Sequence, residues 1–403
     1  MNFDQLFEPA LEAIHWKNRS PAPIETECRE GRFPRCFDRR LQCETTLWCS
    51  NDYLGMGQHP SVIEAVHAAL DRFGAGAGAT PNVVGASPCH VLLEKELAEL
   101  HGQEKALLFT SGYVANQAAL STLARHLCEC IVFADAASHP SIIEGIRNSG
   151  AEAQFFRHND PVDLEKRLAN VDPWRPKLVC FEAVSSRHDD IAPIADICEV
   201  AERYGAMTYL DEADTVGLYG PRGGGISQQD GAMHRLTAIH GSLSRAFGVA
   251  GGYIVGSTRL INFVRALASG FSSTTPLPPA LAAGALASVR HLKSSGAERD
   301  RQRELAASLR RRLIEAGMPV IRSADHIVSV PVGGVARCRI MTDDLLRRFG
   351  LYVRPVYDYD TAGAHRSARL RIIPTARHSE RDIDRLISAL VTVWTEGSLR
   401  RVA

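Results

Sequence analysis

Short polar segments follow several apolar runs of this sequence, and they contain residue types that bind charged ligands. Ser111, Gly112 and Tyr113 stand between the apolar run 106–109 and an amphipathic helical pattern. A helix start presents free N–H groups and the positive end of its dipole, both of which attract phosphate groups. This junction is therefore a candidate phosphate site, although most glycine-containing junctions of this kind bind nothing.

His139 and Asp211 stand at two further junctions. His139 precedes Pro140 at a predicted helix start, where its ring could cover a flat ligand, but a lone histidine there is more often a surface or helix-capping residue. Asp211 ends an apolar run, and a buried carboxylate needs a cationic partner, either a ligand's ring nitrogen or a structural salt bridge. Taken singly, each of these two residues has a ligand-binding interpretation and a purely structural one.

The apolar runs alternate with amphipathic helical patterns, which predicts an α/β fold with a mostly parallel sheet. Buried strands are expected at 106–109, 131–134, 177–181, 207–210 and 252–255, with helices at 114–126, 140–149, 161–169 and 193–204. Open sheets of this type bind ligands beyond the carboxyl ends of their strands, which is where the candidate residues stand.

Composition and patterning divide the chain into three parts. Residues 1–45 are expected to form an N-terminal arm, with a helix from Leu6 to Trp16 followed by an irregular, charged stretch. Residues 46–285 are expected to form a large α/β domain. Residues 286–403 are expected to form a smaller C-terminal α+β domain. Its predicted elements are strands near 326–331 and 368–373, after a long helical tract that runs from the proline-rich segment 276–279 to about residue 317.

The charge balance argues against nucleic acid or an anionic membrane as a partner, because Lys+Arg and Asp+Glu both number 46 among 403 residues. The N-terminus lacks the basic segment and apolar core of a secretory signal, and no apolar run approaches membrane-spanning length, so a cytoplasmic location is expected. The ten cysteines lack the spacing of a zinc site. We predict reduced, structural thiols and no metal site.

Longer motifs give the chain a family resemblance. It resembles the α-oxoamine synthases, in particular the 5-aminolevulinate synthases, over nearly its whole length. The resemblance is carried by the stretches 48–60, 74–80, 142–147, 217–225 and 288–293. In that family, pyridoxal phosphate condenses an amino acid with an acyl-CoA, with loss of carbon dioxide. The resemblance implies a fold-type-I, aminotransferase-like homodimer with active sites shared between subunits.

Matched by position, the resemblance implies a largely intact binding pocket. The implied cofactor contacts are Ser111, Gly112, Tyr113 and Ser242 at the phosphate, His139 over the ring, Asp211 at the ring nitrogen, Ser186 beside the ring, and Thr274 and Thr275 from the neighbouring subunit. The implied substrate contacts are Asn51 and Arg371 for the amino acid carboxylate, and Thr80 and Asn82 for the acyl group.

Arg245 replaces the lysine that carries the cofactor in this family. The segment Ser242–Gly248 matches the family motif Thr-Leu-Gly-Lys-Ala-Phe/Tyr-Gly, with arginine in the lysine position. A guanidinium stays protonated near neutral pH and does not form a Schiff base, so covalently attached pyridoxal phosphate is not expected. None of the six lysines of the chain is an obvious substitute.

Further departures from the family surround the same place. Asp214 replaces a histidine that would lie near the cofactor's phenolic oxygen. We predict an ion pair between Asp214 and Arg245, because either charge would be costly to bury alone. In the segment 185–190 the family usually has Tyr-Ser-Met-Asp-Gly-Asp, and His188 is new there. His188 is either a general base or an exposed loop residue.

Three functions fit these observations. The first is acyl transfer from acyl-CoA or another acyl thioester to a small amine or amino acid, without Schiff-base chemistry. His139 or His188 would be the base, and Asp214 and Arg245 would lie at the reactive centre. The second is a non-catalytic paralogue that binds or regulates a partner protein. The third is 5-aminolevulinate synthesis with noncovalently bound pyridoxal phosphate. We favour the first, because a thioester is already activated for transfer.

Overall fold

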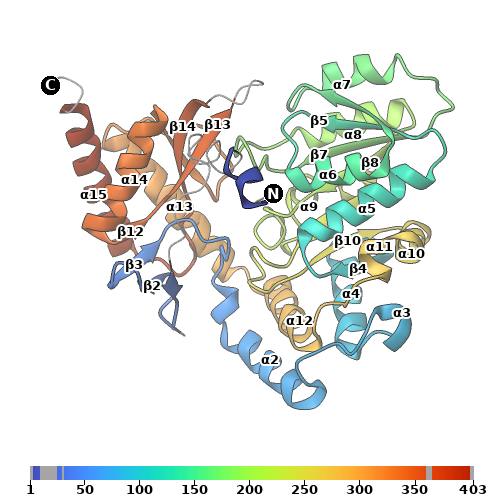
Figure 1. Ribbon diagram of the computed structural model, residues 1–403, viewed down its shortest axis with the longest axis horizontal. Helices are drawn as coiled ribbons and strands as arrows, with labels where there is room; N and C mark the ends of the chain where they lie inside the picture. The colour runs from blue at the N-terminus through green and yellow to red at the C-terminus, as the bar shows by residue number, and fades with distance from the viewer. Residues whose placement is uncertain (1–2, 10–24, 30, 360–364, 400–403) are drawn as a thin grey trace.

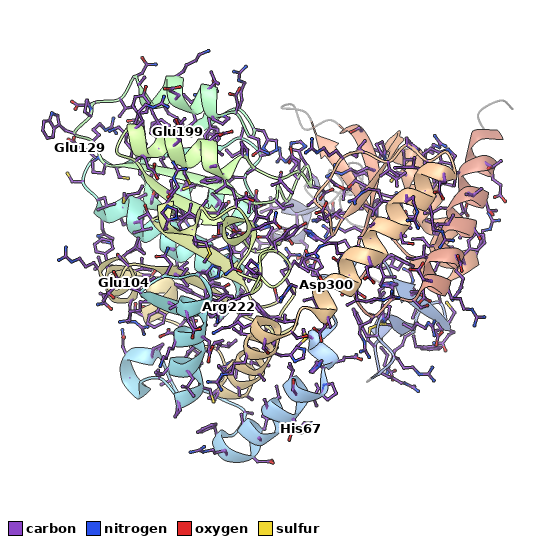
Figure 2. All side chains as sticks on the ribbon, turned by 180° about the vertical axis from the view of Figure 1, so that it is seen from behind. His67, Glu104, Glu129, Glu199, Arg222 and Asp300 are labelled. Carbon is purple, nitrogen blue, oxygen red and sulfur yellow. A yellow bond between two sulfur atoms is a disulfide. The ribbon has the colours of Figure 1, made fainter. Side chains whose placement is uncertain are left out.

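The computed structural model describes residues 3–9, 25–29, 31–359 and 365–399, which form two lobes (Figure 1). The larger lobe holds a seven-stranded sheet, and the smaller lobe holds the C-terminal elements together with strands from the N-terminal part of the chain. None of the described helices combines the length and apolar composition needed to cross a membrane. The residues labelled in Figure 2 are all exposed.

The large sheet is mostly parallel, as predicted. Its strands run in the order β4-β10-β9-β8-β7-β5-β6, and only β10 is antiparallel to its neighbours. The strands are β4 (Lys105–Phe109), β5 (Ile131–Asp135), β6 (Glu152–Phe156), β7 (Lys177–Glu182), β8 (Met207–Asp211), β9 (Ala238–Ser242) and β10 (Gly252–Gly256). Every residue of β5, β9 and β10 is buried, because helices cover both faces of the sheet.

The predicted helices that follow these strands are confirmed to within two residues at each end. They are α5 (Gly112–His126), α6 (Pro140–Ser149), α7 (Pro161–Leu168) and α8 (Ile194–Arg203). The other helices of this lobe are α2 (Pro60–Phe73), α3 (Pro81–Val84), α4 (Pro88–Leu100), α9 (Ile226–Gln229), α10 (Thr258–Leu267) and α11 (Ser269–Ser272), with 3-10 turns at η2 (Met56–Gln58) and η3 (Met233–Arg235).

The single helical tract expected up to residue 317 is in fact two helices. They are α12 (Pro279–Ser294) and α13 (Ala297–Glu315), separated by Ser295 and Gly296. The backbone N–H of Ser295 still caps α12 through the carbonyl of His291, but Ser295 itself is extended. α12 packs against α2 and α4 of the large lobe, whereas α13 packs against α15 of the small lobe. The break therefore lets the chain pass from one lobe to the other.

The small lobe contains two sheets. The antiparallel sheet β11-β14-β13 comprises β11 (Val328–Gly333), β14 (His365–Ile372) and β13 (Arg354–Tyr359), and it packs with α13, α14 (Val335–Phe349) and α15 (Glu380–Leu399). A four-stranded sheet has the order β1-β2-β3-β12, from β1 (Thr26–Glu27), β2 (Arg35–Asp38), β3 (Cys43–Leu47) and β12 (Leu351–Tyr352).

The irregular stretch expected before residue 45 was a wrong prediction, because the strands β1, β2 and β3 lie in this part of the chain. β3 pairs in parallel with β12, so its partner lies about 300 residues away and leaves no local signal in the sequence. The segment Phe3–Leu6 is a 3-10 turn, and most of the helix expected up to Trp16 lies outside the described residues.

The prediction that all cysteines are reduced was also wrong, since Cys28 and Cys36 form a disulfide.

We expect Gly252→Ala to destabilise the large lobe. A Cβ on Gly252 would lie 2.4 Å from the backbone nitrogen of Gly112, so α5 must shift at its first residue. Overpacking of this kind costs about 1–3 kcal/mol, which urea unfolding would measure. At Gly76 an added Cβ meets nothing within 4 Å, and the control Gly76→Ala should change stability by less than about 0.5 kcal/mol. Equal effects of the two substitutions would contradict the packing argument.

Candidate active site

Asp211 is the last residue of β8, and its buried carboxylate has hydrogen-bonding partners at both oxygens. It accepts hydrogen bonds from Asn116 Nδ2 at 2.7 Å and from the backbone N–H of Ala213 at 2.8 Å, and it lies 2.8 Å from Nδ1 of His240. Burial alone would raise the pKa of Asp211, but His240 and these hydrogen bonds lower it below its usual value. The carboxylate therefore stays ionised and can pair with a cationic ring nitrogen.

His139 caps α6 and is held in one orientation. Its Nδ1 lies 2.7 Å from the hydroxyl of Ser141 and accepts from the backbone N–H of Ser141 at 3.2 Å. Burial lowers the pKa of His139, so the ring is neutral near pH 7. Because Nδ1 accepts from an N–H, the remaining proton belongs on Nε2, and the ring is a hydrogen-bond donor at that atom.

The residues expected at the phosphate meet at the start of α5. Ser111 caps this helix by accepting from the N–H of Val114, and a Cβ on Gly112 would lie 3.5 Å from Cβ of Ser242 at the end of β9. The hydroxyl of Ser242 bonds to that of Ser244 at 2.9 Å. The exposed ring of Tyr113 meets the ring of His139 edge-on, with centroids 6.2 Å apart. The free N–H groups of a 15-residue helix and two hydroxyls thus lie together.

The loop after β7 holds Ser186 near the pocket and His188 farther out. The N–H and hydroxyl of Ser186 both lie 3.3 Å from the carboxyl oxygens of Glu182, which also accepts from the N–H of His139 at 2.9 Å. Burial raises the pKa of Glu182 well above its usual value. The exposed ring of His188 lies against that of His158 at a tilt of 38°, with centroids 4.7 Å apart.

Arg245 and Asp214 form the predicted ion pair. Nε of Arg245 lies 3.4 Å from Oδ1 of Asp214, and the hydroxyl of the fully buried Tyr53 donates to the same oxygen. Burial opposes ionisation of Asp214, but Arg245, Arg371 and the Tyr53 hydroxyl together hold the pKa of Asp214 below its usual value. Asp214 in turn raises the pKa of Arg245. The prediction is confirmed, and both side chains carry their charge.

The described lysines lie away from this pocket. Lys95 and Lys166 are exposed on α4 and α7, Lys105 bonds to an asparagine of α10, Lys177 bonds to backbone carbonyls before β7, and Lys293 pairs with two glutamates of α4. The ring and phosphate ends of the pocket therefore fit pyridoxal phosphate, through Asp211, His139 and the start of α5. The aldehyde end offers a guanidinium where covalent attachment requires an amine.

Arg371 lies on β14 at the small-lobe side of the pocket. Its side chain is buried, and Nε lies 2.8 Å from Oδ1 of Asp189. Asp214, Tyr53 and Arg245 all influence its pKa, which is raised above its usual value although burial opposes this. Asn51 is exposed, and its backbone carbonyl accepts from the N–H of Tyr53. Arg371 and the Arg245–Asp214 pair therefore belong to one charge cluster.

The four remaining predicted residues lie on or beside α3 and α11. Thr80 precedes α3, Asn82 is exposed on α3, and Thr274 and Thr275 follow α11, which packs on both α3 and α5. Among the described residues, none of the four side chains forms a hydrogen bond with the pocket. The contacts described above therefore link the other implied cofactor residues and Arg371 within one copy of the chain, but not these four.

Comparison with known proteins decides the family, because the family model described as aminotransferase class I and II matches residues 44–390. The chain belongs to this family. Within it, the chain is an α-oxoamine synthase: the 5-aminolevulinate synthase of Rhizobium meliloti (strain 1021) is 52% identical over 403 residues, which cover 100% of this chain and 99% of that protein. The predicted fold-type-I α/β architecture is confirmed.

Solved serine palmitoyltransferases share the whole fold of this α-oxoamine synthase. The enzyme from Sphingomonas wittichii has a TM-score of 0.90 at 29% identity, with 98% of both chains covered. A lysine-to-alanine variant of the enzyme from S. paucimobilis, with a bound PLP-myriocin aldimine, has a TM-score of 0.89 at 28% identity and covers 99% of this chain and 100% of its own.

Several residues of this α-oxoamine synthase site were missed by sequence reasoning. They are Tyr53, Asn116, Glu182, Asp189 and His240, and all five touch a predicted site residue. Glu182 directly follows the predicted strand 177–181 and could have been found as a carboxylate at a strand tip. The others stand inside apolar or mixed segments, and only long-range packing brings them to the pocket.

We expect Asp214→Asn to destabilise the protein near neutral pH. It leaves the guanidinium of Arg245 without its partner, which costs about 3 kcal/mol for a buried pair, and less here because the Arg245 side chain is 23% exposed. The depressed pKa of Asp214 means that its contribution is complete above its unfolded pKa of about 4 and is lost as the pH falls further. The difference in unfolding free energy between wild type and Asp214→Asn should therefore shrink below about pH 4.

Urea unfolding at pH 7, 5, 4 and 3 would measure this difference. Asp230→Asn is the matched control, because Asp230 is exposed at the end of α9 and should show no such dependence. Equal stability of wild type and Asp214→Asn at pH 7 would contradict a stabilising ion pair.

Proposed function

We propose that this α-oxoamine synthase transfers an acyl group from a thioester, such as acyl-CoA, to a small amine without covalently attached pyridoxal phosphate. The observation that carries the proposal is the Arg245–Asp214 ion pair, which fills the aldehyde end of the pocket with two compensated charges. The family resemblance implies condensation with an acyl-CoA, and the thioester is the part of that chemistry that needs no imine.

The reaction is balanced with the groups present. A neutral amine attacks the thioester carbonyl, a C–N bond forms, and the electron pair moves to the carbonyl oxygen. When that pair returns, the C–S bond breaks and the leaving thiolate takes the proton that the nitrogen loses. The products are an amide and a free thiol.

Arg245 and His139 stabilise the oxygen in this scheme. The guanidinium has N–H groups beyond the one directed at Asp214, and Nε2 of His139 carries a proton, so both can donate to the developing oxyanion. This tautomer of His139 favours a role as hydrogen-bond donor at Nε2 over the role of general base that the sequence suggested. His188 lies on His158 in the outer loop, and the proposal gives it no catalytic role.

A homodimer would complete the pocket. Thr80 and Asn82 lie at the start of α3, Thr274 and Thr275 follow α11, and α11 packs on α3. In this proposal, these residues contact the acyl group and the phosphate region of the second subunit's pocket.

Thiol release from a panel of acyl-CoA donors and small amines, without added pyridoxal phosphate, tests the transfer. We expect amine-dependent release and an amide product seen by mass spectrometry. Arg245→Gln should lower kcat about a hundredfold, the usual loss when one oxyanion donor is removed. Arg222→Gln is the control, because Arg222 is exposed and pairs with Glu99 on α4 (Figure 2). Background release only, for every pair tested, would overturn the proposal.

A second candidate, 5-aminolevulinate synthesis with noncovalent pyridoxal phosphate, is favoured by the ionised Asp211 and by the lysine-to-alanine relative described above. When bound, the cofactor would supply an electron sink at the ring held by Asp211 and His139. A third candidate, a non-catalytic protein that regulates a partner, is favoured by the internal compensation of the pocket's charges.

Cofactor retention separates these candidates. We expect pyridoxal phosphate to leave the wild-type protein during dialysis, because no amine holds it, and to remain on the double variant Arg245→Lys, Asp214→His with a visible absorbance band. Asp214→His alone is the control, since it changes the charge without adding an amine. Stoichiometric retention by the wild-type protein would instead support noncovalent cofactor chemistry.

A further inference from the structure

Asp189 is a buried carboxylate that lies between two arginines of β14. Its Oδ1 is 2.8 Å from Nε of Arg371, and its Oδ2 is 3.2 Å from Nε of Arg369. The hydroxyl of Ser329 on β11 donates to Oδ2 at 2.8 Å. No part of the Asp189 side chain is exposed. Two guanidinium groups of the small sheet thus lie within ion-pair distance of a carboxylate of the chain itself.

The backbone holds this carboxylate in place at a conformational cost. A bridge between Val184 and Ile191 closes the loop 185–190, and Asp189 has a φ of 64°, in the left-handed region. Its N–H donates to the carbonyl of Ser185, and its carbonyl accepts from the N–H of Ala324. Glycine adopts this conformation without strain, and the family motif usually has glycine here, whereas this chain has a residue with a negative charge.

Arg371 connects Asp189 to the reactive centre. It is 8% exposed, and its Nη2 has no hydrogen-bond partner among the residues that the structure describes. Asp214, Tyr53 and Arg245 all act on its pKa, so it lies within electrostatic reach of the Arg245–Asp214 pair. An unpartnered, buried guanidinium nitrogen beside the pocket is a site for an anion. Asp189 and Asp214 already supply that site with negative charge.

We propose that Asp189 is an internal carboxylate that closes the anion site of Arg369 and Arg371, so that the pocket accepts amines that carry no neighbouring carboxylate. A ligand carboxylate would have to lie beside Asp189 and Asp214, and like charges at such distances repel strongly in a buried site. A plain amine meets no such repulsion. The amine acceptor rests on the proposed acyl transfer, whereas the exclusion of carboxylates does not.

Glycine and methylamine form a matched pair for the test, because they differ only by the carboxylate. With the acyl-CoA donor that gives the fastest turnover, kcat/KM would be measured for both acceptors in wild type, Asp189→Gly and Asp189→Asn. We expect the glycine-to-methylamine ratio to rise at least tenfold in Asp189→Gly, which removes charge and volume. A smaller rise is expected in Asp189→Asn, which removes the charge only. Asp190→Asn is the control, because this neighbouring carboxylate pairs with His158 instead.

Binding is measured separately by saturation-transfer NMR with glycine and with methylamine, which needs no turnover. We expect a glycine signal from Asp189→Gly and none from wild type. If no variant turns over but this difference in binding appears, the proposed acyl transfer fails and the role of Asp189 stands. If wild type binds or uses glycine as well as Asp189→Gly does, the role of Asp189 is overturned.

A purely structural role for Asp189 would give a different result. The carboxylate joins the loop after β7 to β11 and β14, so its loss could lower thermal stability in both variants. Lower stability alone leaves the ratio of the two acceptors unchanged. If Asp189→Gly fails to fold, Asp189→Asn serves as the test instead. Asparagine tolerates the left-handed conformation and has nearly the same side-chain volume as aspartate. An unchanged ratio in folded Asp189→Asn would then refute the proposal.

Discussion

The pocket depends on the ion pair between Arg245 and Asp214. Arg245 belongs to the connection between β9 and β10, Asp214 follows β8, and Tyr53, which bonds to Asp214, precedes α2. Three segments that are distant in the sequence are therefore fixed by one pair of charges. Neither charge is stable alone in a buried site, so each residue requires the other. The space where an amine would carry the cofactor is occupied as a result.

A second pair of charges extends this arrangement into the small lobe. Asp189 compensates Arg371 and Arg369, as Asp214 compensates Arg245, and Arg371 lies within electrostatic reach of both acidic residues. This charge cluster thus joins the guanidinium groups of Arg245, Arg369 and Arg371 to the carboxylates of Asp189 and Asp214. A ligand that brings a full negative charge must compete with these internal partners, whereas a neutral or weakly polar ligand does not.

The parallel sheet places the other polar residues by register. Glu182 on β7 is paired with Asp211 on β8, and Asp211 is paired with His240 on β9. The carboxyl ends of these strands lie at one edge, so the three side chains lie side by side without any loop having to position them. Helices α5 and α6 begin at the same edge and bring the N–H groups near Ser111 and the ring of His139. The ring-binding half of the pocket is therefore positioned by the register of the strands in the sheet.

The sequence by itself determined the parallel α/β core, the strand-end positions of His139 and Asp211, and the absence of a lysine at Arg245. These features are local, since they depend on hydrophobic period, on turn residues and on motifs within a few residues of one another. The ion pair between Arg245 and Asp214 was also predictable, because two uncompensated charges in one motif-defined pocket must meet.

Only the tertiary structure decided which residues complete that pocket. Tyr53, Asn116 and His240 come from separate elements, and the pairing of β3 with β12 joins segments about 300 residues apart. The charge of Asp189 was visible in the sequence, but its burial between Arg369 and Arg371 was not, because it requires the loop after β7 to meet β14 across the two lobes. Contacts of this kind are set by the packing of whole elements, and no local pattern encodes them.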